Sequence, residues 1–211
     1  MGKITKLEEG KRNKNRVNVY IDNNFSFAMD LELIYKMGLK VNSEINEDEI
    51  REIAVKEGFS KCKESAIRTI ERSYKTEKEL RDKLHEKEFS DEQIDYAIDF
   101  LIKYNFLDDV KYARMYVKDK LFNQGKNKIR FSLERKGISR DIIEEIFQEF
   151  DNGEELERGL YLCEKKYNLL KKRETDKYKL KDKLFRYLVG RGYDFSTSKE
   201  IINKILNDNE Y

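Results

Sequence analysis

The chain has 211 residues, of which 41% are charged and 38% hydrophobic; 44 basic and 42 acidic residues give a net charge of +2. No apolar stretch approaches the roughly 18 residues that span a bilayer, which excludes a membrane protein. Lys3 and Glu8 interrupt the start of the chain, so we expect no signal peptide and a cytoplasmic location. The 12% of aromatic residues and the regularly spaced Ile and Leu can form a core, which excludes a wholly disordered basic tail.

Proline and cysteine usage bear on helix content and redox state. Proline is absent, so every residue keeps its backbone donor and long helices are permitted. Cys62 and Cys163 lie far apart in a chain for which we expect no export signal. We therefore expect free buried thiols and no disulfide.

The first thirty residues alternate between apolar and polar side chains. This period of two covers residues 3–7, 16–22 and 25–29 and predicts three strands. Asn23-Asn24 separates the last two runs with residues that tolerate positive φ, as a tight hairpin requires. The sequence thus predicts a small N-terminal antiparallel β meander.

The first connection of the meander, residues 10–16, is strongly basic. It is either a solvated hairpin tip or a finger that contacts phosphate. We favour the tip, because charged residues are usual at exposed loops.

The spacing of apolar residues becomes helical after Asp30. A short helix around Ile34 stops at Gly38, and a second helix begins at Asn46, with Glu49 three residues later as in a capping box. We expect Gly58 to end this second helix. Residues 1–58 then form an N-terminal extension.

The remainder of the chain repeats itself. Leu84–Ser90 aligns with Leu133–Ser139 at an offset of 49, and a weaker third copy begins at Leu188, a further 55 residues along. In the third copy, Asp194-Phe195 is interpreted as a two-residue insertion before Ser196. The expected fold is mainly α, with tandem three-helix units in an elongated array, stacked end to end because one unit has a thin core. The three units are expected at residues 59–107, 108–152 and 153–211.

Helix starts within the units are marked by residues suited to N-capping. In the first unit Thr76, with Glu79 reaching back, and Ser90 are expected to cap the second and third helices. Asp108 is expected to cap the first helix of the second unit. Apolar residues at helical spacing follow each cap, which predicts a buried stripe on each helix.

A spaced set of residues around the second unit, expected to be structural, consists of Leu107, Asp108, Asp109, Tyr112, Ala113, Gly125, Ile129, Leu133 and Gly137. In order and spacing this set resembles the central motif of the RecX family, regulators of the RecA recombinase. Residues 76–84 resemble the preceding helix of that family, and the opening strands resemble the β extension of members from Gram-positive bacteria.

The resemblance implies a non-enzymatic protein without a cofactor. It implies that the three-helix units bind in the groove of the RecA filament on single-stranded DNA. There they would inhibit filament growth, ATP hydrolysis and strand exchange, in homologous recombination, DNA repair and the SOS response. We also expect a monomer, with at most weak direct DNA binding.

Residues suited to catalysis or metal binding are scarce. His85 is the sole histidine, which excludes a two-histidine metal site, and a Cys-His pair would have to combine it with Cys62 or Cys163. No phosphate-binding loop of the form G-x-x-x-x-G-K-[ST] occurs. Asp108-Asp109 is better explained by N-capping than by metal chemistry. We expect no catalytic residue and no metal.

Charge is segregated along the chain. Residues 111–140 carry ten basic and two acidic residues, residues 141–157 carry eight acidic and no basic residues, and residues 165–191 carry eleven basic and three acidic residues. Such blocks are either solvated helix faces or a surface for a partner with both signs of charge, and we favour the surface. The candidate partner-binding residues are Lys111, Arg114, Lys118, Lys126, Lys128, Arg130, Arg135, Lys136, Lys179, Lys183 and Arg186.

Three functions remain open. The first is a regulator bound to a nucleoprotein filament. The second is a helical DNA-binding module that uses the second or third helix of each unit. The third, an unrecognised enzyme, has the least support.

Overall fold

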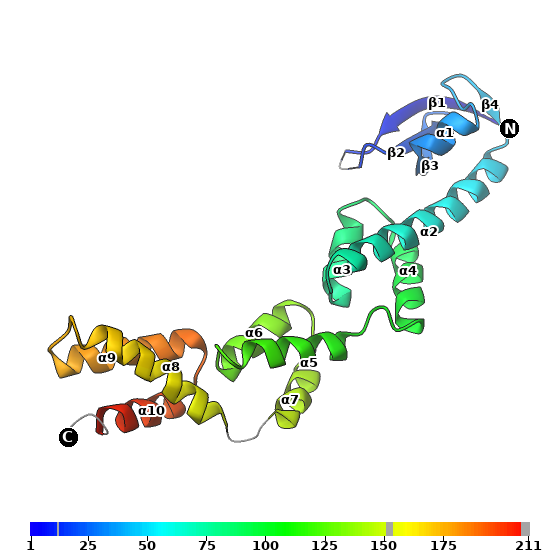
Figure 1. Cartoon of the computed structure of the whole chain (residues 1–211). Helices are drawn as coiled ribbons and strands as arrows, with labels where there is room; N and C mark the ends of the chain where they lie inside the picture. Colours follow the sequence, from blue (N-terminus) through cyan, green and yellow to red (C-terminus); the bar gives the residue numbers. More distant parts are fainter. Residues whose placement is uncertain (12, 151–153, 208–211) are drawn as a thin grey trace. The chain divides into compact units, whose positions relative to one another are not determined.

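The computed structural model describes residues 1–11, 13–150 and 154–207 (Figure 1). It divides into two compact units, residues 1–108 and 109–211, which we treat separately. The fold is mainly helical, with a small N-terminal antiparallel sheet and three tandem three-helix domains, as predicted. The stacking of all three domains into an elongated array stays a prediction.

The N-terminal sheet contains the three predicted strands, β1 (Gly2–Glu9), β2 (Arg16–Ile21) and β3 (Asn24–Asp30). A fourth strand, β4 (Glu44–Ile45), pairs with β1 and completes the order β3-β2-β1-β4. Two residues are too few to show an alternation, which is why the sequence did not predict β4.

The hairpin turn between β2 and β3 lies one residue earlier than predicted. Asp22 and Asn23, not Asn23 and Asn24, have positive φ, at 47° and 69°. Asn24 instead pairs with Ile21 as the first residue of β3. Aspartate tolerates the left-handed region almost as well as asparagine, so the sequence allowed either position.

The sheet packs against α1 (Leu31–Lys36) and the first half of α2 (Glu47–Arg72). Val17, Val19 and Ile21 point into this core, as their alternation predicted. Ile50 and Ala54 of α2 close it from the helical side.

The predicted end of the second helix at Gly58 is wrong, because α2 continues through this residue to Arg72. Gly58 is buried, and a β-carbon there would lie 2.1 Å from Nε2 of Gln93 on α4 (Asp91–Lys103). Glycine is used here because another helix approaches closely, and not to stop the helix. The expected capping box is also absent, since the Asn46 side chain makes no capping hydrogen bond.

The first three-helix domain is formed by the second half of α2, α3 (Glu77–His85) and α4. Its core contains Cys62, Ala66 and Leu84. Both predicted caps are confirmed as capping boxes: Oγ1 of Thr76 accepts from Glu79 N–H at 3.2 Å, and Oγ of Ser90 accepts from Gln93 N–H at 3.4 Å.

The second and third domains make up the other compact unit. Their helices are α5 (Asp109–Lys120), α6 (Lys126–Arg135), α7 (Arg140–Glu149), α8 (Glu154–Leu170), α9 (Lys177–Arg191) and α10 (Phe195–Asn207). Each domain has its own apolar cluster. Separate cores are what a tandem repeat requires.

The same three-residue connection precedes the last helix of every domain. It consists of a residue with positive φ, a buried aromatic or aliphatic residue and a residue just before the helix: Glu88-Phe89-Ser90, Gly137-Ile138-Ser139 and Gly192-Tyr193-Asp194.

The predicted two-residue insertion in the third copy is therefore wrong. Asp194 occupies the place of Ser139: its Oδ1 accepts from Thr197 N–H at 2.8 Å, as Oγ of Ser139 accepts from Ile142 N–H at 3.4 Å. Aspartate and serine cap helices equally well, so the alignment should have equated them. Ser196 lies inside α10, not before it.

Both cysteines are free and buried, as predicted. Burial raises the pKa of the Cys62 and Cys163 thiols to about 12. Neither is therefore a reactive thiolate near neutral pH. Among the described residues, no helix has the length and apolar character of a membrane span.

Candidate partner-binding surface

Part of the predicted basic surface is engaged within the second domain. Nε and Nη2 of Arg114 on α5 both donate to the Glu149 carboxylate of α7 at 2.7 Å. Nε of Arg130 on α6 donates to Oε1 of Glu144 at 2.6 Å. These hydrogen bonds lower the pKa of both glutamates. The basic and acidic stretches of the sequence thus partly neutralise each other in space.

Lys126 lies between the second and third domains. Its Nζ is 3.6 Å from Oε2 of Glu155 on α8, and its backbone N–H donates to Oε1 of the same residue at 3.4 Å. Both side chains are only about a quarter exposed, at 23% and 25%. Lys126 is therefore placed to hold two domains together.

The second basic stretch is interspersed with acids on the surface of the third domain. Nζ of Lys183 lies 2.6 Å from Oε2 of Glu174, and Arg186 pairs with Asp182 one turn away. Lys179 is 4.0 Å from Asp176. Exposed pairs such as Lys179–Asp176 and Arg186–Asp182 contribute only about 0 to 1 kcal/mol each.

The exposed cations of the first basic stretch lie mainly on α5 and α6. Lys118 and Arg140 are exposed and have no ion pair in the part of the chain that the structure describes. Lys111 and Arg135 are exposed and Lys136 is half-buried over the Tyr112 ring.

One face of α6 combines positive charge with an exposed aromatic ring. Lys128, Phe131 and Arg135 recur at helical spacing, and we call them the α6 face. Phe131 is 61% exposed, and the Arg135 guanidinium lies 5.8 Å from its ring centre. The charge analysis did not select Phe131, although its position off the apolar stripe could have indicated an exposed ring.

Most of the other residues in the motif that resembles RecX lie in the cores or connections of the first two domains. Ala113, Ile129 and Leu133 are fully buried in the core of the second domain. Leu107 packs in the first domain, and Tyr112 lies at the edge of the second core. Gly137 has a φ of 92°, which glycine adopts without strain. Asp108 and Asp109 stand at the start of α5.

The residues that remained candidates for catalysis are not brought into a site. Nε2 of His85 lies 3.5 Å from Oδ1 of Asp91 on the surface of the first domain, whereas both thiols are buried. Over the described ranges, no group of three or more His, Cys, Asp or Glu side chains is placed to hold a metal ion.

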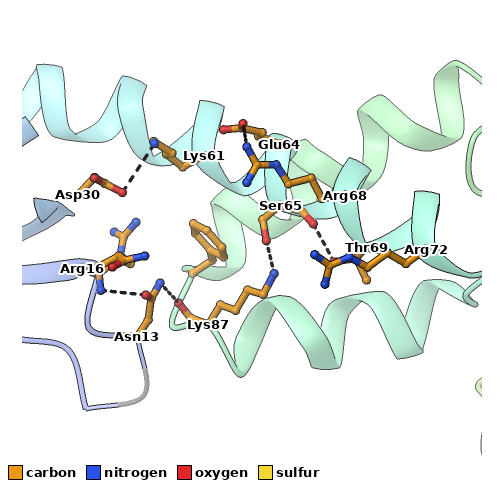
Figure 2. A pocket seen from close by; sticks show the side chains of 12 residues that line it. Asn13, Arg16, Asp30, Lys61, Glu64, Ser65, Arg68, Thr69, Arg72 and Lys87 are labelled. Carbon is orange, nitrogen blue, oxygen red and sulfur yellow. Dashed lines mark hydrogen bonds and ion pairs between the residues drawn. The ribbon is translucent and has the colours of Figure 1, made fainter. Parts of the chain in front are cut away.

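A basic cleft in the first compact unit was not predicted. It lies where the residue 10–16 connection and Asp30 face α2 and the end of α3 (Figure 2). The interpretation of that connection as a solvated tip overlooked this neighbourhood, since Asn13 and Arg16 line the cleft. Arg12 lies outside the described residues, as does Asp151 of the acidic stretch.

Tandem three-helix domains with exposed cations and rings define a helical repeat protein suited to a macromolecular partner.

Family models match the chain in four consecutive segments. Residues 2–46 match the regulatory protein RecX N-terminal domain, and residues 62–101, 108–146 and 153–202 match the first, second and third three-helix domains of RecX. The chain belongs to the RecX family of regulatory proteins.

Relatives of the same length support this membership. Regulatory protein RecX of Clostridium perfringens (strain 13 / Type A) is 54% identical over 211 residues, covering 100% of this chain and 99% of the relative. Regulatory protein RecX of Clostridium beijerinckii is 48% identical over 206 residues, covering 98% and 97%.

Solved structures share the fold. A crystal structure of regulatory protein RecX aligns with a TM-score of 0.66 at 24% identity, covering 96% of this chain and all of the other. RecX from Lactobacillus salivarius aligns with a TM-score of 0.63 at 24% identity, covering 71% of this chain and 97% of the other.

Proposed function

We propose that this protein regulates the RecA recombinase by binding its filament on single-stranded DNA. Bound there, it inhibits filament growth, ATP hydrolysis and strand exchange in recombinational DNA repair and the SOS response. The observation that carries the proposal is the ordered match of the N-terminal domain and all three three-helix domains to the RecX family.

The repeated domains support a filament as the partner. A filament offers the same surface at each subunit, and tandem domains can occupy neighbouring copies at once. Linked contacts of modest strength then combine into tight binding, because each later contact forms at high effective concentration. Exposed cations such as Lys118 and the α6 face would attract a partner that carries phosphate and acidic side chains.

In this proposal the protein acts without catalysing a reaction. A bound array blocks subunit addition and restrains the subunits it contacts, and neither effect requires bond chemistry. The buried thiols, with their raised pKa, and the surface position of His85 agree with that role.

The test is to add the purified full chain to RecA on single-stranded DNA and to follow ATP hydrolysis and filament length together. We expect hydrolysis to fall and filaments to shorten as the protein is added. A matched reaction with RecA on DNA, receiving the same buffer, is the control. A folded protein that changes neither quantity would overturn the proposal.

Direct action on nucleic acid is the second candidate, favoured by the exposed ring and cations of the α6 face. The salt dependence separates the two. Contact with six to ten phosphates would lower affinity by about 10³ to 10⁵ between 50 and 200 mM salt. Docking mainly on protein would lower affinity less over the same range.

A further inference from the structure

The basic cleft of the first compact unit has a volume of about 400 Å³. It is lined by the connection between β1 and β2, by Asp30 just before α1, by the second half of α2 and by the connection between α3 and α4 (Figure 2). All four segments belong to residues 1–108, and Asn13 links two of them: its Nδ2 donates to the backbone oxygen of Lys87 at 3.4 Å.

Positive charge is in excess in the cleft. Two of its cations pair with acids: Nζ of Lys61 is 3.8 Å from Oδ2 of Asp30, and Nη2 of Arg68 is 2.5 Å from Oε1 of Glu64. Arg16 forms the floor, only 7% exposed, with Nη2 donating to the backbone oxygen of Ala28 at 3.1 Å and its guanidinium 5.4 Å from the Phe89 ring centre.

The remaining two cations, Arg72 and Lys87, have no carboxylate partner within the described residues. Nζ of Lys87 donates to Oγ of Ser65 at 2.5 Å. Burial first, and the charge of Arg72 second, lower the pKa of Lys87. A half-buried lysine among cations is held at an energetic cost that a bound anion would relieve.

The donors around these cations suit phosphate. Hydroxyls and side-chain amides join arginine and lysine in most protein contacts with the nucleic-acid backbone. Ser65 accepts from Lys87, which leaves the hydrogen of its hydroxyl for another acceptor. Asn13 and Asn15 line the same cleft, on the connection between β1 and β2.

An exposed aromatic ring lies beside the cleft. A second hollow shares Asn15, Asp30 and Lys61 with the first and is also lined by Tyr35. Tyr35 is 80% exposed. Aromatic rings next to a basic groove stack with unpaired bases, and a base in a duplex cannot stack in this way.

We propose that this cleft binds single-stranded nucleic acid, with a phosphodiester against Arg72 and Lys87 at one end and a base further along the same strand on Tyr35. An acidic protein segment would pair with the cations, but its carboxylates would not stack on the Tyr35 ring. The site does not rest on the recombinase, because purified chain and DNA suffice to test it.

The test measures the fluorescence anisotropy of a labelled oligo(dT) of 20 nucleotides with the full chain carrying Arg72→Gln and Lys87→Gln. Glutamine keeps a donor at both positions and removes the charge. We expect affinity to fall about tenfold, since each surface charge contact contributes a factor of about three. The slope of log affinity against log salt should become shallower by about 0.7, the value for the loss of one phosphate contact on a single strand.

The matched control carries Lys56→Gln and Lys103→Gln, two exposed lysines of the same unit outside the cleft. It should bind like the original chain, and Tyr35→Ala should weaken binding with little change in salt slope. Arg72→Gln alone, at an exposed position, gives a second measurement if the double variant unfolds by circular dichroism.

Four results would overturn the proposal. The first two are an unchanged affinity for oligo(dT) in the cleft variants and an equal loss of affinity in the cleft and control variants. The third is a poly-glutamate peptide that displaces oligo(dT) and whose binding depends on Arg72 and Lys87. The fourth is inorganic phosphate that binds as tightly as the oligonucleotide.

Discussion

The backbone of Gly125, just before α6, lies against the backbone of Gly192, just after α9. The Gly125 N–H donates to the carbonyl oxygen of Arg191 at 2.9 Å, and the Asn127 N–H donates to that of Gly192 at 3.2 Å. A β-carbon on Gly125 would lie 2.5 Å from the carbonyl carbon and oxygen of Gly192. A backbone group cannot move aside as a flexible side chain can. A residue without a β-carbon is therefore needed at position 125 for the second and third domains to join at this point.

Gly125→Ala should destabilise this junction by about 1 to 3 kcal/mol, the usual cost of overpacking. Thermal unfolding of the full chain measures the change. The matched control is Gly190→Ala in α9, where a β-carbon would meet nothing within 4 Å. That change should stabilise the chain by about 0.5 to 1 kcal/mol, because alanine favours helix. Equal melting temperatures for the two variants would contradict the role of Gly125.

Glu57→Gln should change how stability depends on pH. Neither carboxylate oxygen of Glu57 has a hydrogen-bond partner in the described structure. Burial first, then the charge of Asp30, raise the pKa of Glu57 above its ordinary value of 4.5. The native state therefore holds this proton more tightly than the unfolded state. The contribution of Glu57 to stability falls as pH rises from 4.5 through the native pKa, and stays low above it.

Glutamine cannot ionise, so the Glu57→Gln variant does not lose this stability as pH rises. Urea unfolding at several pH values should show the variant gaining stability relative to the original chain as pH rises from 4 to 7. The other carboxylates contribute equally to the unfolding free energies of both proteins, so their effects cancel in the difference. A stability difference that is constant over the range would show that Glu57 is not a buried ionised group.

Reversal of four exposed charges tests the proposed regulatory surface. We choose Lys111, Lys118, Arg135 and Arg140 for change to Glu. Lys126 and Lys128 are left out because Lys126 pairs with Glu155 and Nζ of Lys128 donates to the backbone oxygen of Gly190, both between domains. Each contact contributes about 0.2 to 1 kcal/mol, so single changes should do little. Four reversals should sum to several kcal/mol and lower affinity for the RecA filament about a hundredfold or more.

The control for this prediction carries four Lys→Glu changes in the first unit, at Lys56, Lys63, Lys75 and Lys78. Lys61 is unsuitable as a control because it lines the basic cleft. Inhibition of RecA ATP hydrolysis is the measurement. Equal loss in both sets would mean that overall charge matters and this surface does not; full inhibition by both would place recognition on other parts of the helices.

Residues 109–211 should fold without the rest of the chain. Every residue of their two apolar clusters lies between Tyr112 and Leu206, within this unit. We expect a helical circular dichroism spectrum and a cooperative thermal transition from the isolated fragment. A fragment without such a transition would show that the first unit supports this core.

Local features of the structure follow from neighbouring residues in the sequence. Alternation indicated β2, Thr76 followed three residues later by Glu79 indicated one cap, and Ser90 before an apolar helical pattern indicated another. Each feature depends on contacts between residues a few positions apart, so the residues that cause it lie close together in the sequence. The internal repeat extended that local information to a fold of three similar domains.

Features that depend on distant residues required the folded chain. Gly58 has the same local character as a helix end, and only the approach of Gln93 from α4 explains why the helix continues through it. The pairing of Arg114 with Glu149 crosses 35 positions. The basic cleft joins Asn13 to Lys87 across 74. Periodicity and capping carry no information about which of many lysines and glutamates meet, because that choice is made by the packing of whole helices.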